Sequence, residues 1–302
     1  MKNARAHVAP FSFSAGRPFA RVADYLELAK PRLNFLVVAT SAAGYYLGAP
    51  GAPELAPMAQ AVAGTALVAG GAAVLNQVYE RDTDALMRRT RTRPLPDGRV
   101  APADACIYGL VLSGCGLALL ATRANLLAAI VALVTLLTYL VVYTPLKRRS
   151  PMATLVGAVP GALPALIGWV ARHGSWSVGG WSLFAIVFCW QIPHFMAIAW
   201  LYRDDYRKAG FPMLPVVDPE GTRTARHAVA FATALVPATL IPTLVGTSGG
   251  IYFVVALVLG TALLGLAVRF SLARSENSAW ALFFGSIVYL PLIWIAMIAD
   301  RT

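Results

Sequence analysis

Three side chains with oxygen donors recur at four-residue intervals near position 80. Asn76, Glu80 and Asp84 would fall within about 80° of one another on a helix. Asn76 lies about one turn inside an apolar run, where a polar side chain normally faces the interior of a helical bundle. Carboxylate and amide oxygens suit a hard cation such as Mg²⁺, which keeps waters and bridges phosphate oxygens. The spacing therefore predicts a metal-ligating face; the alternative is a polar helix end among lipid headgroups.

Basic residues crowd the connections next to this triplet. They are Arg81, Arg88, Arg89, Arg91, Arg93, Lys147, Arg148 and Arg149. Carboxylates that hold Mg²⁺ beside Arg and Lys are what a diphosphate needs, because the metal neutralises charge and guanidinium groups take the remaining oxygens. The alternative is charge that sets membrane orientation and attracts anionic lipid.

The composition says which elements must position these residues. Of 302 residues, 58% are hydrophobic and only 13% are charged, whereas a soluble globule carries about 25% charged residues. Continuous apolar runs lie at about 33–49, 58–79, 103–121, 125–143, 152–170, 178–201, 228–246, 250–269 and 279–299. They are too long and continuous for barrel strands. We expect an all-α polytopic membrane protein with nine transmembrane helices around a central cavity.

The placement of Lys and Arg predicts the orientation. Twenty-two of them fall in the N-terminal arm and the even-to-odd connections, and only Arg123, Arg172 and Arg301 lie on the other side. The positive-inside rule then places the N-terminus in the cytoplasm and the C-terminus outside. Residues 1–30, without a visible signal peptide, are expected to form a cytoplasmic arm, and residues 31–302 a single membrane domain. The net charge of +11 is thereby explained without a nucleic-acid partner.

The two longest cytoplasmic connections resemble each other. Residues 80–84 end the second apolar run, 202–206 end the sixth, and Pro-rich stretches follow both. We interpret this as a weak internal duplication of a four-helix unit, which often places a site at the repeat interface. Chance similarity is the alternative.

The segment from Asn76 to Leu95 resembles the first aspartate-rich motif of the UbiA-type intramembrane prenyltransferases. The residues that carry this resemblance are Asn76, Glu80, Arg81, Asp82, Asp84, Met87, Arg89, Thr90 and Arg93-Pro94-Leu95. Within that superfamily the chain is most similar to the protohaem IX farnesyltransferase branch. The resemblance covers nearly the whole chain. Its further motifs are Lys30-Pro31-Arg32, Tyr143-Thr144-x-Leu146-Lys147-Arg148, Gly161-x-x-Pro164-x-Leu166-Ile167-Gly168-Trp169, Trp190-Gln191-x-Pro193-His194-Phe195 and Asp205-Tyr206-x-x-Ala209-Gly210-x-Pro212-Met213-Leu214-Pro215.

The resemblance implies transfer of farnesyl from farnesyl diphosphate to a vinyl group of haem B, giving haem O and diphosphate. It implies Mg²⁺ as cofactor on Asn76, Glu80 and Asp84, with Lys147 as a further catalytic residue. Haem is then a substrate, membrane lipid surrounds the chain, and a haem A synthase or oxidase assembly factor is a possible partner. The expected location is the bacterial inner membrane. The residues expected to bind substrate are Arg81, Arg89, Arg93, Tyr143, Arg148, His194, Asp204, Asp205 and Tyr206.

The chain departs from the quinone-type relatives at their second D-x-x-x-D motif. By the internal repeat, its outer positions are Tyr202 and Tyr206, with Asp204 and Asp205 between them. We therefore expect one Mg²⁺ at the first motif, with Asp204 or Asp205 contributing through water. The alternatives are a prenyltransferase for a quinone precursor, which should carry the full second motif, a transporter with mid-helix charges, and a haem-binding assembly factor.

His194 follows Pro193 and lies about 12 Å of helical rise inside Tyr202. Imidazole is the commonest axial ligand of haem iron. This depth and the resemblance predict contact with haem. His194 is then expected across the cavity from Asn76, on facing helices formed by the second and sixth apolar runs. The alternative is a buried histidine that is hydrogen-bonded to a neighbouring helix.

Overall fold

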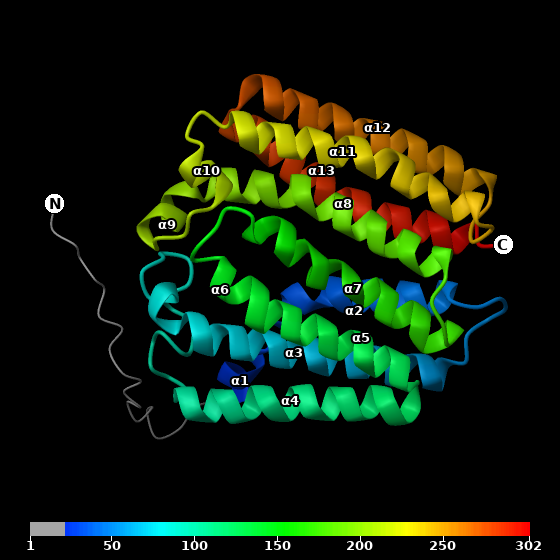
Figure 1. Cartoon of the computed structure of the whole chain (residues 1–302), viewed down its shortest axis with the longest axis horizontal. Coiled ribbons are helices and arrows are strands. Elements are labelled where there is room, and N and C mark those ends of the chain that lie inside the picture. The colour runs from blue at the N-terminus through cyan, green and yellow to red at the C-terminus, as the bar shows by residue number, and fades with distance from the viewer. Residues whose placement is uncertain (1–21) are drawn as a thin grey trace, which may run out of the picture.

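Long helices form nearly all of the computed structural model, which is described from residue 22 to residue 302 (Figure 1). They are α2 (Pro31–Leu47), α3 (Leu55–Asp84), α4 (Pro102–Arg123), α5 (Leu126–Leu137), α7 (Ala153–His173), α8 (Val178–Leu201), α11 (Thr222–Leu244), α12 (Gly250–Ala273) and α13 (Glu276–Ala299). A π-helical segment, η1 (Thr138–Tyr143), and α6 (Thr144–Leu146) continue α5. Over the described range the only β-type pairing is an isolated bridge between Ser248 and Arg301. The all-α prediction is confirmed.

Eight helical segments in residues 22–302 are long and apolar enough to cross a bilayer. They are α3, α4, the continuous α5–η1–α6 segment, α7, α8, α11, α12 and α13. The remaining predicted span is the first apolar run, at about 33–49, which forms α2. Its 17 residues rise about 26 Å, slightly less than the ~30 Å hydrocarbon core. It ends at Leu47 because Gly48, Pro50 and Gly51 form the turn that follows. The chain is a multi-pass membrane protein.

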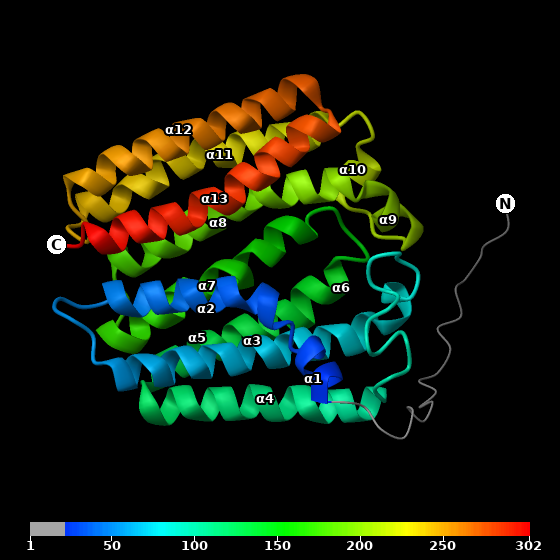
Figure 2. The same ribbon diagram turned by 180° about the vertical axis from the view of Figure 1, so that it is seen from behind.

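The helices lie roughly parallel in two groups. In Figures 1 and 2, α8, α11, α12 and α13 form one group, α3, α4 and α5 form the other, and α2 and α7 lie between them. The most extensive pairings join α3 with α4, α8 with α11, α2 with α7, and α11 with α12. The pair α2 and α7 therefore connects the two halves of the bundle.

The backbones of α2 and α7 meet at small residues. A Cβ added at Gly168 would overlap the carbonyl oxygen of Ser41, and one added at Gly44 would overlap that of Ala165. Lipid tails are as apolar as side chains, so membrane helices associate through such close packing rather than through the hydrophobic effect. This crossing fixes the distance between the two halves.

Gly168→Ala is accordingly expected to lower stability without removing any polar group. The methyl group must displace the main chain of α2, and such overpacking typically costs about 1–3 kcal/mol. Thermal unfolding of the purified chain in micelles measures the effect. Gly265→Ala on α12, where an added Cβ meets nothing within 4 Å, is the matched control. Equal melting temperatures for the two variants would contradict the close crossing.

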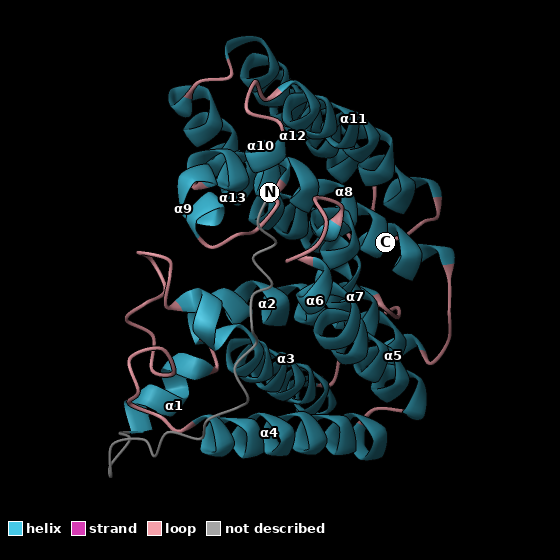
Figure 3. Ribbon diagram, turned by 60° about the vertical axis from the view of Figure 1, so that its left-hand side comes forward, coloured by secondary structure: helices cyan, strands magenta, loops and turns pink. Residues whose placement is uncertain are grey.

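Short helices and long connections gather at one end of the bundle. Figures 1 and 3 place α1 (Val22–Leu28), α9 (Arg203–Lys208) and α10 (Leu214–Val217) there. One apolar cluster joins Met87 to Tyr206, Phe211 and Met213, so the connections that follow α3 and α8 pack on each other. The predicted four-helix repeat is imperfect here: α3 continues to Asp84, whereas α8 stops at Leu201 and α9 starts as a separate helix.

The predicted N-terminal arm is only partly within the described range. Residues 1–21 lie outside it. Residues 22–28 form α1, in which Leu28 is fully buried and accepts a 2.6 Å hydrogen bond from the Gln77 side chain at its carbonyl oxygen. Asp24 forms an ion pair with Arg99. These contacts attach α1 to α3 and to the connection after α3.

Candidate active site

The last three turns of α3 carry the predicted triplet on one buried face. The exposed fractions of Asn76, Glu80 and Asp84 are 3%, 4% and 1%. Asp82, on the same helix end, has a side chain that is 86% exposed. The four-residue spacing thus separates buried carboxylates from an exposed one, as the sequence predicts.

Each buried carboxylate has a basic partner from another part of the chain. Lys147 Nζ lies 3.1 and 3.2 Å from the two carboxylate oxygens of Glu80. Arg93 donates to Asp84 Oδ2 at 2.6 Å. Lys147 and Arg93 are 16% and 22% exposed at the side chain, so both pairs are shielded from bulk water. Buried charges require such partners because ionic groups lose most of their hydration there.

Asn76 uses its amide nitrogen, and not its amide oxygen, for a hydrogen bond within residues 22–302. Its Nδ2 donates to Thr144 Oγ1 at 3.1 Å, and Thr144 donates in turn to the Tyr139 carbonyl oxygen at 2.8 Å. This chain of bonds fixes the orientation of the amide. Oδ1 accepts no hydrogen bond from residues 22–302 and is not one of the enclosed, unpartnered atoms of that range. The oxygen is therefore open to a ligand.

The donor set fits a hard divalent cation. An amide oxygen and two carboxylates on one helix face are oxygen ligands, and Mg²⁺ typically takes one or two carboxylates and completes its shell with water and phosphate. No group of three or more His, Cys, Asp or Glu side chains that could hold a metal occurs in the described part of the chain. The amide and carboxylate oxygens of this face suit a cation that also takes ligands from water and a bound phosphate.

A change of helix type positions Lys147. The transition from α5 through η1 to α6 brings Tyr139 and Tyr143 beside each other, with ring centroids 5.4 Å apart. π-helical turns are rare and occur frequently at functional sites. Lys147 lies over the Phe211 ring at 4.9 Å and the Tyr143 ring at 6.0 Å.

The charge of Lys147 is strongly stabilised. Burial by itself would lower the pKa of Lys147, but the Glu80 carboxylate outweighs it and raises the pKa above the ordinary range. The ammonium group therefore stays charged at any physiological pH.

The connection after α3 folds back onto the site. Thr90 donates to the Asp84 carbonyl oxygen at 2.7 Å, which helps to place Arg93 against the Asp84 side chain. Arg89 lies over the Tyr202 ring at 5.2 Å and so connects this segment with the end of α8. Tyr206 is buried against Phe211.

The structure does not bring all predicted substrate ligands to the triplet. Arg81 pairs with the exposed Asp82. Asp204 is 68% exposed at its side chain and pairs with Arg207 of its own helix, while Asp205 is half-buried. No side-chain bond joins Arg148 or Asp205 to the triplet, and their roles stay predictions.

Lys30, the first residue of the Lys30-Pro31-Arg32 motif, lies close enough to the site to be influenced by its charges. It precedes α2 in the left-handed region, with φ 49° and ψ 55°, which is uncommon for a non-glycine residue. Burial lowers the pKa of Lys30 to about 7, the charges of Arg93 and Lys147 act in the same direction, and Asp84 and Glu80 oppose them. The feature of the sequence that could have indicated this residue is the Lys30-Pro31 pair just before the first apolar run.

His194 has the hydrogen bond that the packing alternative predicts. Its Nδ1 lies 2.8 Å from Ser286 Oγ of α13. Its helix α8 packs mainly against α7, α11 and α13, and α3 belongs to the other half of the bundle (Figure 1). A role in substrate contact stays a prediction, because this bond occupies only one ring nitrogen.

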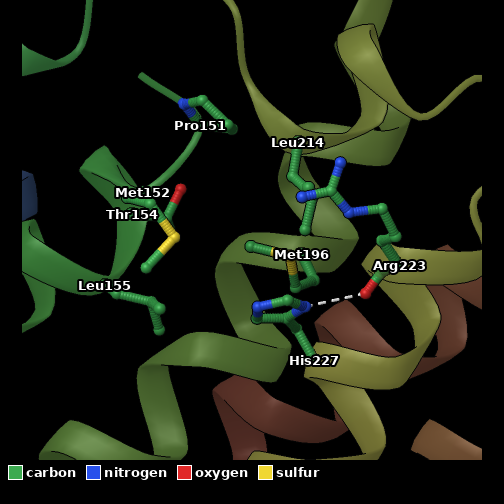
Figure 4. Close-up of a pocket in the computed structure, with 8 residues that line it drawn as sticks. All are labelled: Pro151, Met152, Thr154, Leu155, Met196, Leu214, Arg223 and His227. Carbon is green, nitrogen blue, oxygen red and sulfur yellow. Dashed lines mark hydrogen bonds between the residues drawn. The ribbon is translucent and has the colours of Figure 1, made fainter.

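A separate small pocket lies between the ends of α7, α8, α10 and α11 (Figure 4). Its volume is about 20 Å³, enough for about one water molecule. His227 lines it and donates from Nδ1 to the Arg223 carbonyl oxygen at 2.8 Å. The pocket is too small for either predicted substrate.

The fold and this site define a class: a helical multi-pass membrane protein with an acidic, Lys- and Arg-paired site at one end of the bundle. The chain matches the UbiA prenyltransferase family over residues 37–289, and it belongs to that family. The family assignment made from the motifs is confirmed.

Similar proteins cover almost the whole chain. A protein named protoheme IX farnesyltransferase from Solibacter usitatus is 45% identical over 92% of this chain and 98% of its own length. One of the same name from Anaeromyxobacter sp. is 47% identical over 91% of this chain and 92% of its own length.

Solved structures show the same fold at low sequence identity. A digeranylgeranylglyceryl phosphate synthase superposes with a TM-score of 0.78 at 17% identity and covers 92% of this chain and 97% of its own. A UbiA homologue from Archaeoglobus fulgidus bound to GPP and Mg²⁺ has a TM-score of 0.63 at 17% identity and covers 91% of this chain and 99% of its own.

Proposed function

We propose that this protein transfers the farnesyl group of farnesyl diphosphate to a vinyl group of haem B, forming haem O and diphosphate. The geometric observation that supports a diphosphate is the buried face of α3, where Glu80 pairs with Lys147 and Asp84 with Arg93. The relatives named protoheme IX farnesyltransferase indicate haem as the acceptor and farnesyl as the transferred group.

Mg²⁺ is the proposed cofactor, held by Asn76, Glu80 and Asp84. The A. fulgidus homologue with GPP and Mg²⁺ supports this choice, as does the oxygen-only donor set. When bound, the ion supplies positive charge to the phosphate oxygens and weakens the bond to the leaving group.

The protein's own groups carry the rest of the reaction. Lys147 and Arg93 lie where the departing diphosphate gains charge, and preorganised donors of this kind stabilise a transition state without reorganisation. The allylic C–O bond breaks with its electron pair on diphosphate, and the vinyl π electrons form the new C–C bond. Water then adds to the haem-side cation and loses a proton.

We further propose that the site faces the cytoplasm from a bacterial inner membrane. The basic residues of α9 and of the connection after α3 lie at the end of the bundle where α3 finishes with Glu80 and Asp84 (Figure 1). A haem A synthase or an oxidase assembly factor is the kind of partner that would take up the product.

The direct test is incubation of membranes that contain the chain with haem B and labelled farnesyl diphosphate. We expect label in a more apolar haem pigment on chromatography, loss of the product on treatment with EDTA, and its return with excess Mg²⁺. Label on a hydroxybenzoate but not on haem would indicate the quinone-type alternative. Undiminished product after metal removal would contradict the role of the cation.

A further inference from the structure

The residues around His194 constrain the orientation of its imidazole ring. Its imidazole is nearly parallel to the Trp190 ring of its own helix, with centroids 5.1 Å apart and planes at 20°, and to the Phe283 ring of α13, at 5.2 Å and 24°. Stacking on these two rings, together with the contact to Ser286, limits how far the histidine ring can turn. The edge of the ring, which carries the two nitrogens, is the part that can form hydrogen bonds or ligate a metal.

The hydrogen bonds at Ser286 determine which ring nitrogen carries the proton. Ser286 Oγ donates to the Phe283 carbonyl oxygen at 2.6 Å. A hydroxyl has a single proton, so Ser286 can only accept at its 2.8 Å contact with His194 Nδ1. Nδ1 must donate, and in the neutral ring the lone pair is then on Nε2. Trp190 Nε1 donates to the Ser286 carbonyl oxygen at 2.8 Å and holds the serine in register.

Nε2 is accessible. It has no hydrogen-bond partner among residues 22–302, yet it is not one of the fully enclosed unpartnered atoms of that range. An imidazole with Nδ1–H bonded to an oxygen and Nε2 free is the arrangement that metal-ligating histidines adopt, because the outer bond fixes the tautomer and the ring orientation.

We infer that Ser286 is a positioning residue that holds His194 in the Nδ1–H form and so presents Nε2 to the iron of the haem acceptor. This inference rests on the proposed function. His194 lies eight residues, about 12 Å of rise, inside Tyr202, which contacts the connection after α3 through Arg89. His194 and the Glu80–Lys147 and Asp84–Arg93 pairs would then hold the acceptor and the diphosphate at different depths of the bundle.

The experiment compares two ligands that differ only in the metal. The purified full-length chain in micelles is titrated with ferric haem B and with metal-free protoporphyrin IX, and farnesyl diphosphate binding is measured separately. Wild type should bind haem at least about tenfold more tightly than protoporphyrin. His194→Gln should abolish this preference. Ser286→Ala should reduce haem affinity about 10-fold or more, as loss of an outer-shell partner does, and shift the Soret band. Ser286→Thr, which keeps the hydroxyl, should retain the haem affinity and the Soret band of wild type.

Two control variants match these changes. His227→Gln removes a histidine that has the same Nδ1 bond to an oxygen but faces the 20 Å³ pocket (Figure 4). Ser182→Ala removes a buried serine hydroxyl of α8 that donates to the Gly179 carbonyl oxygen. Both should leave haem affinity and the Soret band as in wild type.

The outcomes separate this inference from the proposed function. If His194→Gln and Ser286→Ala weaken haem and protoporphyrin equally, or weaken neither, His194 does not ligate iron and the inference is overturned while the acceptor stands. If wild type binds farnesyl diphosphate but neither porphyrin, haem is not the acceptor and the proposed function fails with it. Loss of haem preference with unchanged farnesyl diphosphate affinity is the supporting result.

Discussion

Glu80→Gln and Asp84→Asn are each expected to lower prenyl transfer at least about 100-fold, the range seen when one preorganised electrostatic group is removed from an active site. Each substitution keeps the shape of the side chain and removes the charge that the cation requires. The buried partners Lys147 and Arg93 also lose their counter-charge, so the field around the diphosphate changes as well. Turnover at saturating Mg²⁺, measured with labelled farnesyl diphosphate and haem, tests the expectation.

Asp82→Asn is the matched control for this pair. Asp82 lies between the two carboxylates in sequence, but its side chain is 86% exposed and pairs with the neighbouring Arg81. We expect near wild-type turnover for this variant. A variant of Glu80 or Asp84 that retains more than about a tenth of wild-type turnover, which is less than about 1.4 kcal/mol of lost transition-state stabilisation, would count against the metal role.

The sequence was sufficient to predict the transmembrane helices and the face of α3 that forms one side of the site. Apolar runs longer than about 17 residues can only be helices in lipid, and the i, i+4, i+8 spacing places Asn76, Glu80 and Asp84 together whatever the tertiary structure. The density of basic residues indicated that Lys147 and Arg93 belong to the same region.

The pairings could not be predicted because they depend on how distant segments meet. Lys147 reaches Glu80 through the π-helical turn before it, and no periodicity of residues announces such a turn. Asp204 was grouped with the site by its place in the repeat, but α8 ends early and α9 turns this residue towards Arg207. The position of Lys30 near the site depends on a left-handed backbone conformation. The contact of Ser286 with His194 depends on the packing of α13 against α8. These are properties of the assembled bundle.

Lys147→Met is expected to produce the second large effect, on both stability and substrate affinity. It leaves the Glu80 carboxylate buried at 4% exposure without its partner. Removing one member of a buried ion pair costs about 3–5 kcal/mol, which denaturant unfolding in micelles would detect. Farnesyl diphosphate should also bind more weakly by about 1.5–3 kcal/mol, the value of one hydrogen bond to a charged group. An unchanged affinity would show that Lys147 does not contact the diphosphate and would leave it only its pairing with Glu80 and its charge at the membrane surface.

The double variant Glu80→Gln/Lys147→Met separates these two effects. It contains no unpaired buried charge, and replacing both members of a buried pair is often neutral for stability. We therefore expect its free energy of unfolding to return close to that of wild type, while prenyl transfer stays as low as in Glu80→Gln alone. Recovery of stability without recovery of turnover would show that the pair serves the reaction rather than the fold. If stability stays as low as in Lys147→Met, the loss comes from the packing of the lysine stem against Tyr143 and Phe211, and the electrostatic role assigned to the pair is wrong.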